Sequence, residues 1–136
     1  MTYISPALRR QIYQQAEGRC EYCLLHERYT IKRHEVDHIY AEKHGGGAAA
    51  DNLCLCCAVC NRFKGSDMAS LDPETGAPVF LFHPRRDLWA QHFRLEGARI
   101  VGLTPQGRAT VRLLHVNDDD SVDERARLIR LRRYPK

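Results

Sequence analysis

The sequence predicts an α+β fold, in which a small pair of strands and a helix are held against an N-terminal helix by a metal site. Three observations support this prediction. Four of the six cysteines form two C-x-x-C pairs, a segment rich in β-branched and aromatic residues and a second, shorter segment flank a glycine loop, and helix-start signals occur near both ends of the chain. A chain of 136 residues buries a limited apolar core and often needs a metal as an additional link.

The N-terminal segment is expected to be a helix that begins at Pro6, with Ser5 as its N-cap. Leu8 and Ile12 follow at helical spacing, and Gly18 is suited to end the helix. The first cysteine pair comes directly after this helix. A metal held by that pair is therefore expected to fasten the helix to the rest of the fold.

Two strands and a second helix are expected in the middle of the first half. The segment 29–40 predicts a strand that ends near His38, and a shorter strand is expected at about 53–56. The glycine run at 45–47 between them indicates a flexible loop. A helix is expected from about 58 to just past 64, where a Gly-Ser pair breaks it.

The composition changes after residue 70, where a turn-rich stretch predicts a connection. Beyond it we expect a strand, a hairpin, a helix and a last basic helix that opens with a capping box, at 79–82, 93–103, 105–115 and from Ser121–Glu124 onward. The prediction is two units: residues 1–70 with the N-terminal helix and both cysteine pairs, and residues 71–136 as a small C-terminal α/β extension with a hairpin and a basic helix.

Composition and the N-terminus favour a cytoplasmic location. The chain is 43% hydrophobic and 28% charged, and no run approaches the ~20 apolar residues of a membrane span, so no membrane partner is expected. The first residues lack a basic segment followed by an apolar one, so no signal peptide is expected either. The formal net charge of +4 is compatible with a nucleic-acid partner, although many proteins that bind no nucleic acid have the same excess.

The cysteine pairs are expected to bind one structural zinc ion. Doubled C-x-x-C spacing in a reducing compartment is typical of a tetrahedral site, here with the ligands Cys20, Cys23, Cys57 and Cys60. Two redox motifs or two disulfides are the alternative, which the lack of a secretory signal disfavours. Cys54 and Cys56 are expected to be small packing residues, with a ligand set shifted onto Cys56 as the lesser alternative.

A second group of residues has the chemistry that phosphodiester hydrolysis requires, namely an activated water, a cation on the phosphate and relief of charge on the leaving oxygen. A neutral imidazole at His38 can deprotonate water, and Asp37 supplies an anionic oxygen for a hard cation such as Mg²⁺. Asn61 supplies an amide oxygen to the same cation, and Asn52 can hold the loop and His38 by hydrogen bonds. Strand alternation puts Asp37 and His38 on opposite faces, so they serve one phosphate only if the strand ends or twists there.

These residues resemble the HNH endonuclease family. The matching motifs, in the family's order, are Asp37-His38-Ile39, Gly45-Gly46, Asn52-Leu53 and Cys60-Asn61-x-x-Lys64-Gly65, and the cysteine pairs resemble the zinc-bearing branch of the family. The match covers about residues 17–67. The resemblance implies a ββα-metal (His-Me finger) core in which His38 is the general base, Asp37 and Asn61 hold a catalytic Mg²⁺ or Mn²⁺, and Asn52 orients the histidine loop.

The same resemblance implies a DNA endonuclease whose products carry a 5′-phosphate and a 3′-hydroxyl. A non-catalytic zinc-stapled nucleic-acid-binding module and an RNA-cleaving nuclease on the same fold stay open as alternatives. For contact with DNA we expect Arg62 and Lys64 on the site helix, and Arg127 and Arg130 in the basic segment 125–136. Solvated helix surfaces are the alternative interpretation of these charges.

Overall fold

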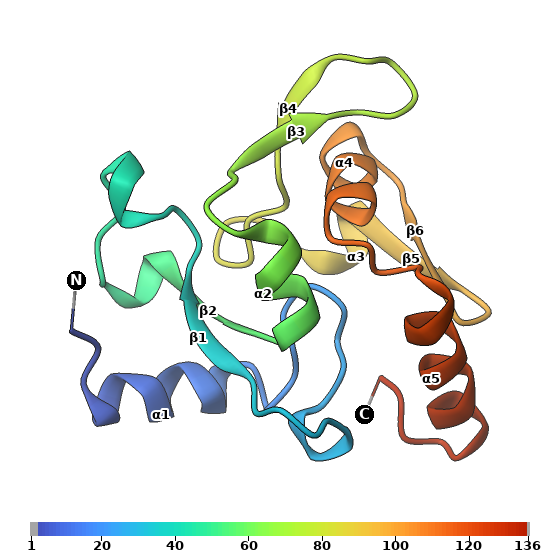
Figure 1. Ribbon diagram of the computed structural model, residues 1–136, viewed down its shortest axis with the longest axis horizontal. Coiled ribbons are helices and arrows are strands. Elements are labelled where there is room, and N and C mark those ends of the chain that lie inside the picture. Colours follow the sequence, from blue (N-terminus) through green and yellow to red (C-terminus); the bar gives the residue numbers. More distant parts are fainter. Residues whose placement is uncertain (1–2, 136) are drawn as a thin grey trace.

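The computed structural model describes residues 3–135 and shows an α+β fold, which confirms the predicted class (Figure 1). Three two-stranded antiparallel sheets are present in this range, each separate from the others. The helices and strands are α1 (Pro6–Gln15), β1 (Glu35–His38), β2 (Leu53–Cys56), α2 (Ala58–Lys64), β3 (Ala69–Leu71), β4 (Pro78–Phe80), α3 (Trp89–His92), β5 (Phe93–Glu96), β6 (Arg99–Gly102), α4 (Pro105–Leu113) and α5 (Asp119–Arg130).

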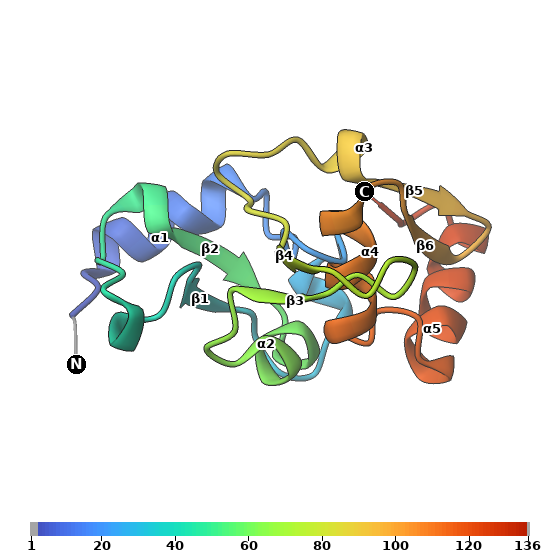
Figure 2. The same ribbon diagram turned by 90° about the horizontal axis from the view of Figure 1, so that it is seen from above.

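The two views place α1 and α5 at opposite ends of the molecule, with the first hairpin and α2 between them (Figure 1, Figure 2). Short 3-10 turns complete the connections: η1 (Glu27–Tyr29), η2 (Glu42–His44) and η3 (Ala50–Asn52). No helix within residues 3–135 is both long and apolar enough to span a bilayer.

Helix α1 forms as the sequence predicts. The Oγ of Ser5 accepts a hydrogen bond from the Leu8 amide at 3.2 Å, and Pro6 occupies the first turn, where its missing N–H costs nothing. Ile12 is fully buried and packs with Leu53 and Leu55 of β2 in a small apolar cluster. This packing fastens α1 to the back of the first hairpin.

The hairpin of β1 and β2 has a register that pairs Asp37 with Cys54 and His38 with Leu53. Strand β2 has the predicted bounds, whereas β1 begins at Glu35, later than the predicted start at residue 29. Tyr29 lies in the turn η1, and the partner strand β2 ends at Cys56 opposite Glu35, so residues 30–34 have no strand to pair with in this sheet. The predicted end of the strand at His38 is confirmed.

One hydrophobic core continues across the boundary expected at residues 70 and 71, which falls inside β3. The core combines the cysteines of the predicted zinc site with apolar residues of the C-terminal half, among them Phe82, Phe93, Ile100, Leu114 and Val116. Polar contacts also join the two halves, because the Trp89 indole donates to the Tyr22 carbonyl at 2.9 Å. The C-terminal extension therefore shares its core with the first half.

The last helix differs from the prediction at its start. α5 begins at Asp119, and its N-cap Asp118 lies three residues before Ser121, the N-cap of the predicted capping box. Asp119 and Asp120 place negative charge in the first turn, where the helix dipole favours it. Strand β3 and the single turn α3 were not predicted, because segments of three and four residues are too short to show a period.

The C-terminal segment is folded against the body of the protein. Arg125 is only 3% exposed, and its guanidinium donates to the carbonyls of Ala98 (2.7 Å) and Val116 (2.6 Å). The Tyr134 hydroxyl donates to the Cys23 carbonyl at 2.6 Å. Arg125 and Tyr134 of the segment 125–136 therefore stabilise the fold, and Arg125 is unavailable to a phosphate.

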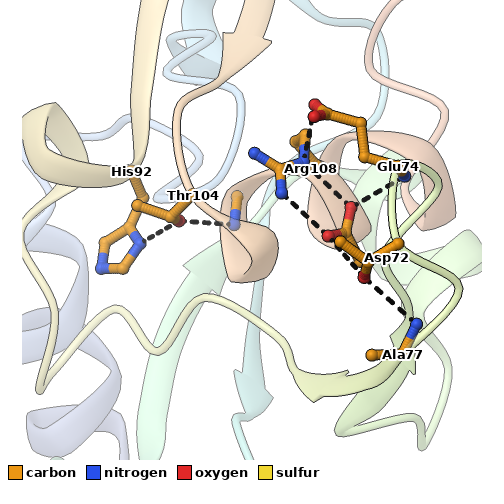
Figure 3. Close-up of polar contacts among 8 residues, drawn as sticks. Asp72, Glu74, Ala77, His92, Thr104 and Arg108 are labelled. Carbon is orange, nitrogen blue, oxygen red and sulfur yellow. Dashed lines mark hydrogen bonds and ion pairs between the residues drawn. The ribbon is translucent and has the colours of Figure 1, made fainter.

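A buried ion pair connects the β3–β4 loop to α4 (Figure 3). Asp72 has no exposed surface, and its two carboxylate oxygens accept hydrogen bonds from Arg108 at 2.9 and 2.8 Å. Thr75 donates to the same carboxylate at 3.0 Å. The Arg108 guanidinium holds the pKa of Asp72 well below its usual range, so the carboxylate stays ionised in the folded protein.

Removal of this partner is expected to destabilise the protein strongly. Arg108→Ala leaves a buried carboxylate without its cation, and such changes belong to the large destabilising class. We expect a clear fall in Tm, measured by thermal denaturation. The matched control is Arg112→Ala, which removes an exposed arginine from the same helix and should leave Tm nearly unchanged. Equal Tm values for the two variants would contradict a stabilising role for the pair.

Candidate active site and metal centre

The four predicted zinc ligands converge on one point. The sulfur atoms of Cys20, Cys23, Cys57 and Cys60 all lie within 4.8 Å of one another, and the sulfurs of Cys23 and Cys57 are 3.8 Å apart. A tetrahedral site with Zn–S bonds of ~2.3 Å has sulfur–sulfur edges of about 3.8 Å. The four thiols are free and buried. This cluster is therefore positioned for a zinc ion.

Local structure explains why the four sulfurs meet. The chain turns at the first pair, where the Leu24 amide donates to the Cys20 carbonyl at 2.8 Å. At the second pair Cys57 is the N-cap of α2, and its sulfur accepts a hydrogen bond from the Cys60 amide at 3.4 Å. The first pair is thus fixed by a turn and the second by a helix start.

The two remaining cysteines lie outside the four-cysteine cluster. Cys54 and Cys56 have no exposed surface, and the Cys54 sulfur lies 3.8 Å from the Tyr22 hydroxyl. Burial raises the pKa of the Cys54 thiol, and hydrogen bonding to Cys20 raises the pKa of the Cys56 thiol. Both residues are therefore suited to apolar packing, and the cluster favours Cys57 over Cys56 as a ligand.

Asp37 lies near the end of β1 beside α2. Its carboxylate is 22% exposed, and the oxygen Oδ2 is buried without a hydrogen bond from the described residues. Burial raises the pKa of Asp37, and the Lys64 ammonium, 3.6 Å from Oδ2, opposes this shift. The site thus holds a carboxylate oxygen that residues 3–135 leave without a hydrogen bond.

His38 is the last residue of β1 and faces the loop that follows. Its ring nitrogen Nε2 is buried without a hydrogen bond from the described residues, and it lies 4.0 Å from Oε1 of Glu42 on η2. The strand ends here, as the shared use of Asp37 and His38 requires. An imidazole nitrogen that has no hydrogen bond from the described residues is able to accept a proton from a bound water.

Asn52 fixes the loop that follows His38. Its side-chain oxygen accepts from the Tyr40 amide at 2.9 Å, and its Nδ2 donates to the carbonyls of Tyr40 (2.9 Å) and Gly47 (2.7 Å). A Cβ at Gly46 would lie 1.8 Å from the Tyr40 carbonyl oxygen, so the close crossing of this loop requires glycine. Asn52 makes these bonds to the backbone of the loop, and it does not bond the His38 ring.

Asn61 lies on α2 and meets Glu35, a residue that the sequence analysis did not single out. The amide Nδ2 donates to Oε2 of Glu35 at 2.7 Å, which leaves the amide oxygen on the other side of the group. Glu35 precedes Asp37 by two residues in β1, so strand alternation puts both carboxylates on one face. That spacing could have identified Glu35 from the sequence. The structure records no direct contact between Asn61 and Asp37.

The predicted nucleic-acid contacts fall in different environments. Lys64 is only 2% exposed, and its ammonium donates to the His38 carbonyl at 3.2 Å. The ammonium is buried at the end of β1 in the free protein, and its predicted role as a phosphate contact stays a prediction. Arg62 is exposed, with its guanidinium 4.7 Å above the Phe63 ring. Arg130 is exposed on α5, where Arg127 forms an ion pair with Glu124 at 2.8 Å.

Comparison with known proteins places this constellation in one family. Residues 20–67 match a family model described as HNH endonuclease. A search of curated proteins and a search of solved structures gave no significant match. The matched segment holds the four-cysteine cluster and all of Asp37, His38, Asn52 and Asn61. Residues 20–67 are therefore an HNH endonuclease domain.

Proposed function

We propose that this protein is a metal-dependent endonuclease that hydrolyses phosphodiester bonds in DNA in the cytoplasm. An HNH domain implies nuclease chemistry in general. The observation that carries the finer proposal is the pair of buried acceptor atoms at the end of β1. Asp37 Oδ2 and His38 Nε2 both lack hydrogen bonds from the described residues. Buried polar atoms without a hydrogen bond are rare in folded proteins, and such atoms support the presence of a ligand or a reacting group.

The oxygen donors fit a hard divalent cation such as Mg²⁺ or Mn²⁺. Asp37 offers its buried carboxylate oxygen, and Asn61 offers its amide oxygen while Glu35 holds the nitrogen of the same amide. Two protein ligands leave most of the coordination shell for water and phosphate oxygens. When bound, such a cation would offset the negative charge that builds up on the phosphate and on the leaving oxygen.

The residues of the chain would carry out the proton transfer. His38 Nε2 accepts a proton from a water molecule, and the oxygen of that water forms a bond to phosphorus. The bond between phosphorus and the 3′ oxygen breaks, which leaves a 5′-phosphate and, after protonation, a 3′-hydroxyl. Glu42 Oε1, 4.0 Å from Nε2, would stabilise the imidazolium that forms. Asn52 would keep the histidine loop in place through its three backbone hydrogen bonds.

The proposed metal ligands make a prediction that separates their roles. Asp37→Asn removes the formal charge among the two ligands, whereas Asn61→Asp adds one. The first variant should raise the Mn²⁺ concentration required for half-maximal cleavage by about 10–100-fold or more. Loss of a residue that only supports a metal ligand already has an effect of about this size. The second should change it less. Direct Mn²⁺ binding, measured by electron paramagnetic resonance, should weaken in the same order.

The matched control is Asp51→Asn, the same chemical change at an exposed aspartate of η3. It should leave both metal binding and cleavage as in the wild type. If the Asp37 variant binds Mn²⁺ as tightly as the Asp51 variant, Asp37 is not a ligand and the proposed site is wrong.

Contacts with DNA are proposed for three of the predicted residues. Arg62 and Arg130 are exposed and have no ion-pair partner within residues 3–135, so both are available to a phosphate. Arg127 would have to exchange its exposed pair with Glu124 for a phosphate, which costs little at a surface. Their contribution would be sequence-independent, since phosphate contacts carry no base information.

A further inference from the structure

Two open grooves beside η1 are lined by arginines, of which only Arg132 and Arg133 belong to the basic segment 125–136 expected to contact DNA. The first groove has a volume of about 570 Å³ and lies between α1 and the residues that lead into β1. Its charged lining residues are Arg9, Arg10, Arg33, Glu27 and Glu35. Glu35 also accepts the hydrogen bond from Asn61, so this groove adjoins the candidate active site.

The second groove has a volume of about 590 Å³ and lies between the turn after α1 and the C-terminal segment. Its charged lining residues are Glu17, Arg19, Arg28, Arg132 and Arg133. The bond from the Tyr134 hydroxyl to the Cys23 carbonyl holds the C-terminal segment in this position. Because η1 contributes residues to both grooves, the two are neighbours, and we call them together the arginine track.

The protein does not neutralise the charge of the arginine track. Within residues 3–135, none of its seven arginines forms an ion pair, whereas Arg85, Arg94, Arg108 and Arg127 each contact a carboxylate. Seven arginines against three glutamates leave the track with an excess of four positive charges. The whole chain has a formal net charge of +4, so the rest of the molecule is balanced.

The second groove also contains an unsatisfied donor. The Arg19 nitrogen Nη1 is buried and has no hydrogen-bond partner among the described residues. Burial lowers the pKa of the His26 ring, and the positive charges of Arg28 and Arg19 lower it further. An anion in this groove would supply a counter-charge for the arginines that line it.

We propose that the arginine track binds the phosphate backbone of the nucleic-acid substrate and leads it to the candidate active site. The inference deepens the proposed function and rests on it for the identity of the polyanion. A row of unpaired arginines along connected grooves suits a partner with regularly repeated negative charge. Backbone binding of this kind adds affinity and orientation without base preference.

The test measures binding in a His38→Ala background, so that the nucleic acid stays intact. A fluorescein-labelled DNA duplex and an RNA duplex of the same sequence are titrated by fluorescence anisotropy over a series of KCl concentrations. The variants are Arg9→Ala/Arg33→Ala for the first groove and Arg28→Ala/Arg133→Ala for the second. Arg99→Ala/Arg112→Ala, which removes two exposed arginines outside both grooves, is the control with equal loss of charge.

Each groove variant should reduce the slope of log K against log salt concentration by about two, since each lost phosphate contact contributes about 0.9. The control should keep the parental slope, and Arg28→Lys/Arg133→Lys should recover most of the lost slope. An equal reduction with DNA and RNA would indicate backbone contact alone, and a reduction with one of them would identify the substrate. Groove variants with the parental Tm and the slope of the control would overturn the proposal.

The two proposals fail in different ways. If the wild-type protein binds a duplex through the arginine track but cuts neither DNA nor RNA, the proposed nuclease function is wrong and the proposed binding by the track still holds. If the wild-type protein cleaves normally and the groove variants keep the parental slope of log K against log salt concentration, the proposed binding by the track is wrong and the proposed nuclease function still holds.

Discussion

His38→Ala is expected to abolish cleavage of DNA while binding of DNA persists. A general base contributes typically 10²–10⁴-fold to a rate, and His38 is the residue at the end of β1 whose ring nitrogen Nε2 is buried without a hydrogen bond from the described residues. Affinity depends instead on phosphate contacts spread over the surface. The measurement is the single-turnover cleavage rate of a labelled duplex, together with its Kd.

The control for this prediction is His44→Ala, which removes an exposed histidine from η2. It should cleave at the wild-type rate. Wild-type cleavage by His38→Ala would mean that another group activates the water. Loss of both cleavage and binding, with a lowered Tm, would assign His38 to the fold instead of to the chemistry.

Loss of the zinc ion is expected to unfold the protein. Structural zinc sites in small domains have apparent binding free energies of ~10–16 kcal/mol, which is comparable to the ~5–15 kcal/mol stability of a typical domain. The cysteine cluster also lies within the main hydrophobic core and joins α1, β2 and α2. Cys57→Ser should therefore lose zinc and lose its folded circular dichroism spectrum.

The zinc content and the folding of cysteine variants distinguish the proposed zinc ligands from the neighbouring cysteines. Purified wild-type protein should contain about one zinc ion per chain. Cys54→Ser, a change at a buried cysteine outside the cluster, should keep that zinc even if its Tm falls. Zinc-free wild-type protein that is fully folded, or mass spectra that show two disulfides, would contradict a structural zinc site.

The parts of the fold that the sequence predicted are those with local physical causes. The caps at Ser5 and Thr104 each accept a hydrogen bond from an amide of the first turn, and both helices start as expected. Strand β2 and helix α2 also follow from local pattern. The paired cysteine spacing predicted a cluster that depends on contacts between residues more than thirty positions apart.

The features that could not be predicted from the sequence depend on burial in the tertiary structure. The sequence pattern predicts that Lys64 and Arg125 lie at the surface. Both side chains are buried, and their charged groups donate hydrogen bonds to backbone carbonyls. A local pattern does not distinguish a solvated cation from one that donates to the end of a distant strand. The sequence predicted a nucleic-acid contact in the C-terminal segment, but the assembly of the arginine track could not be predicted, because it brings arginines of the first thirty-three positions beside arginines of that segment.

The candidate site residues were predicted in part, since their grouping follows from the sequence and some of their contacts do not. The order of the motifs predicted that Asp37, His38, Asn52 and Asn61 belong to one site, and the structure places them around the end of β1 and on α2. Hydrogen bonds from Asn52 to the loop were predicted, whereas the bond from Asn61 to Glu35 was not. Glu35 was within reach of the sequence analysis, since its two-residue offset from Asp37 puts it on the same strand face.

The central claim is that this HNH domain is an active, metal-dependent nuclease, and the most direct test is cleavage of supercoiled plasmid by the wild-type protein. Reactions in metal-free buffer are compared with reactions that contain Mg²⁺ or Mn²⁺, and the zinc content of the protein is checked in each. We predict that nicked or linear plasmid appears only with the added divalent ion, with 5′-phosphate ends. Plasmid that stays intact with either ion, in the presence of folded protein that binds it, would contradict the claim.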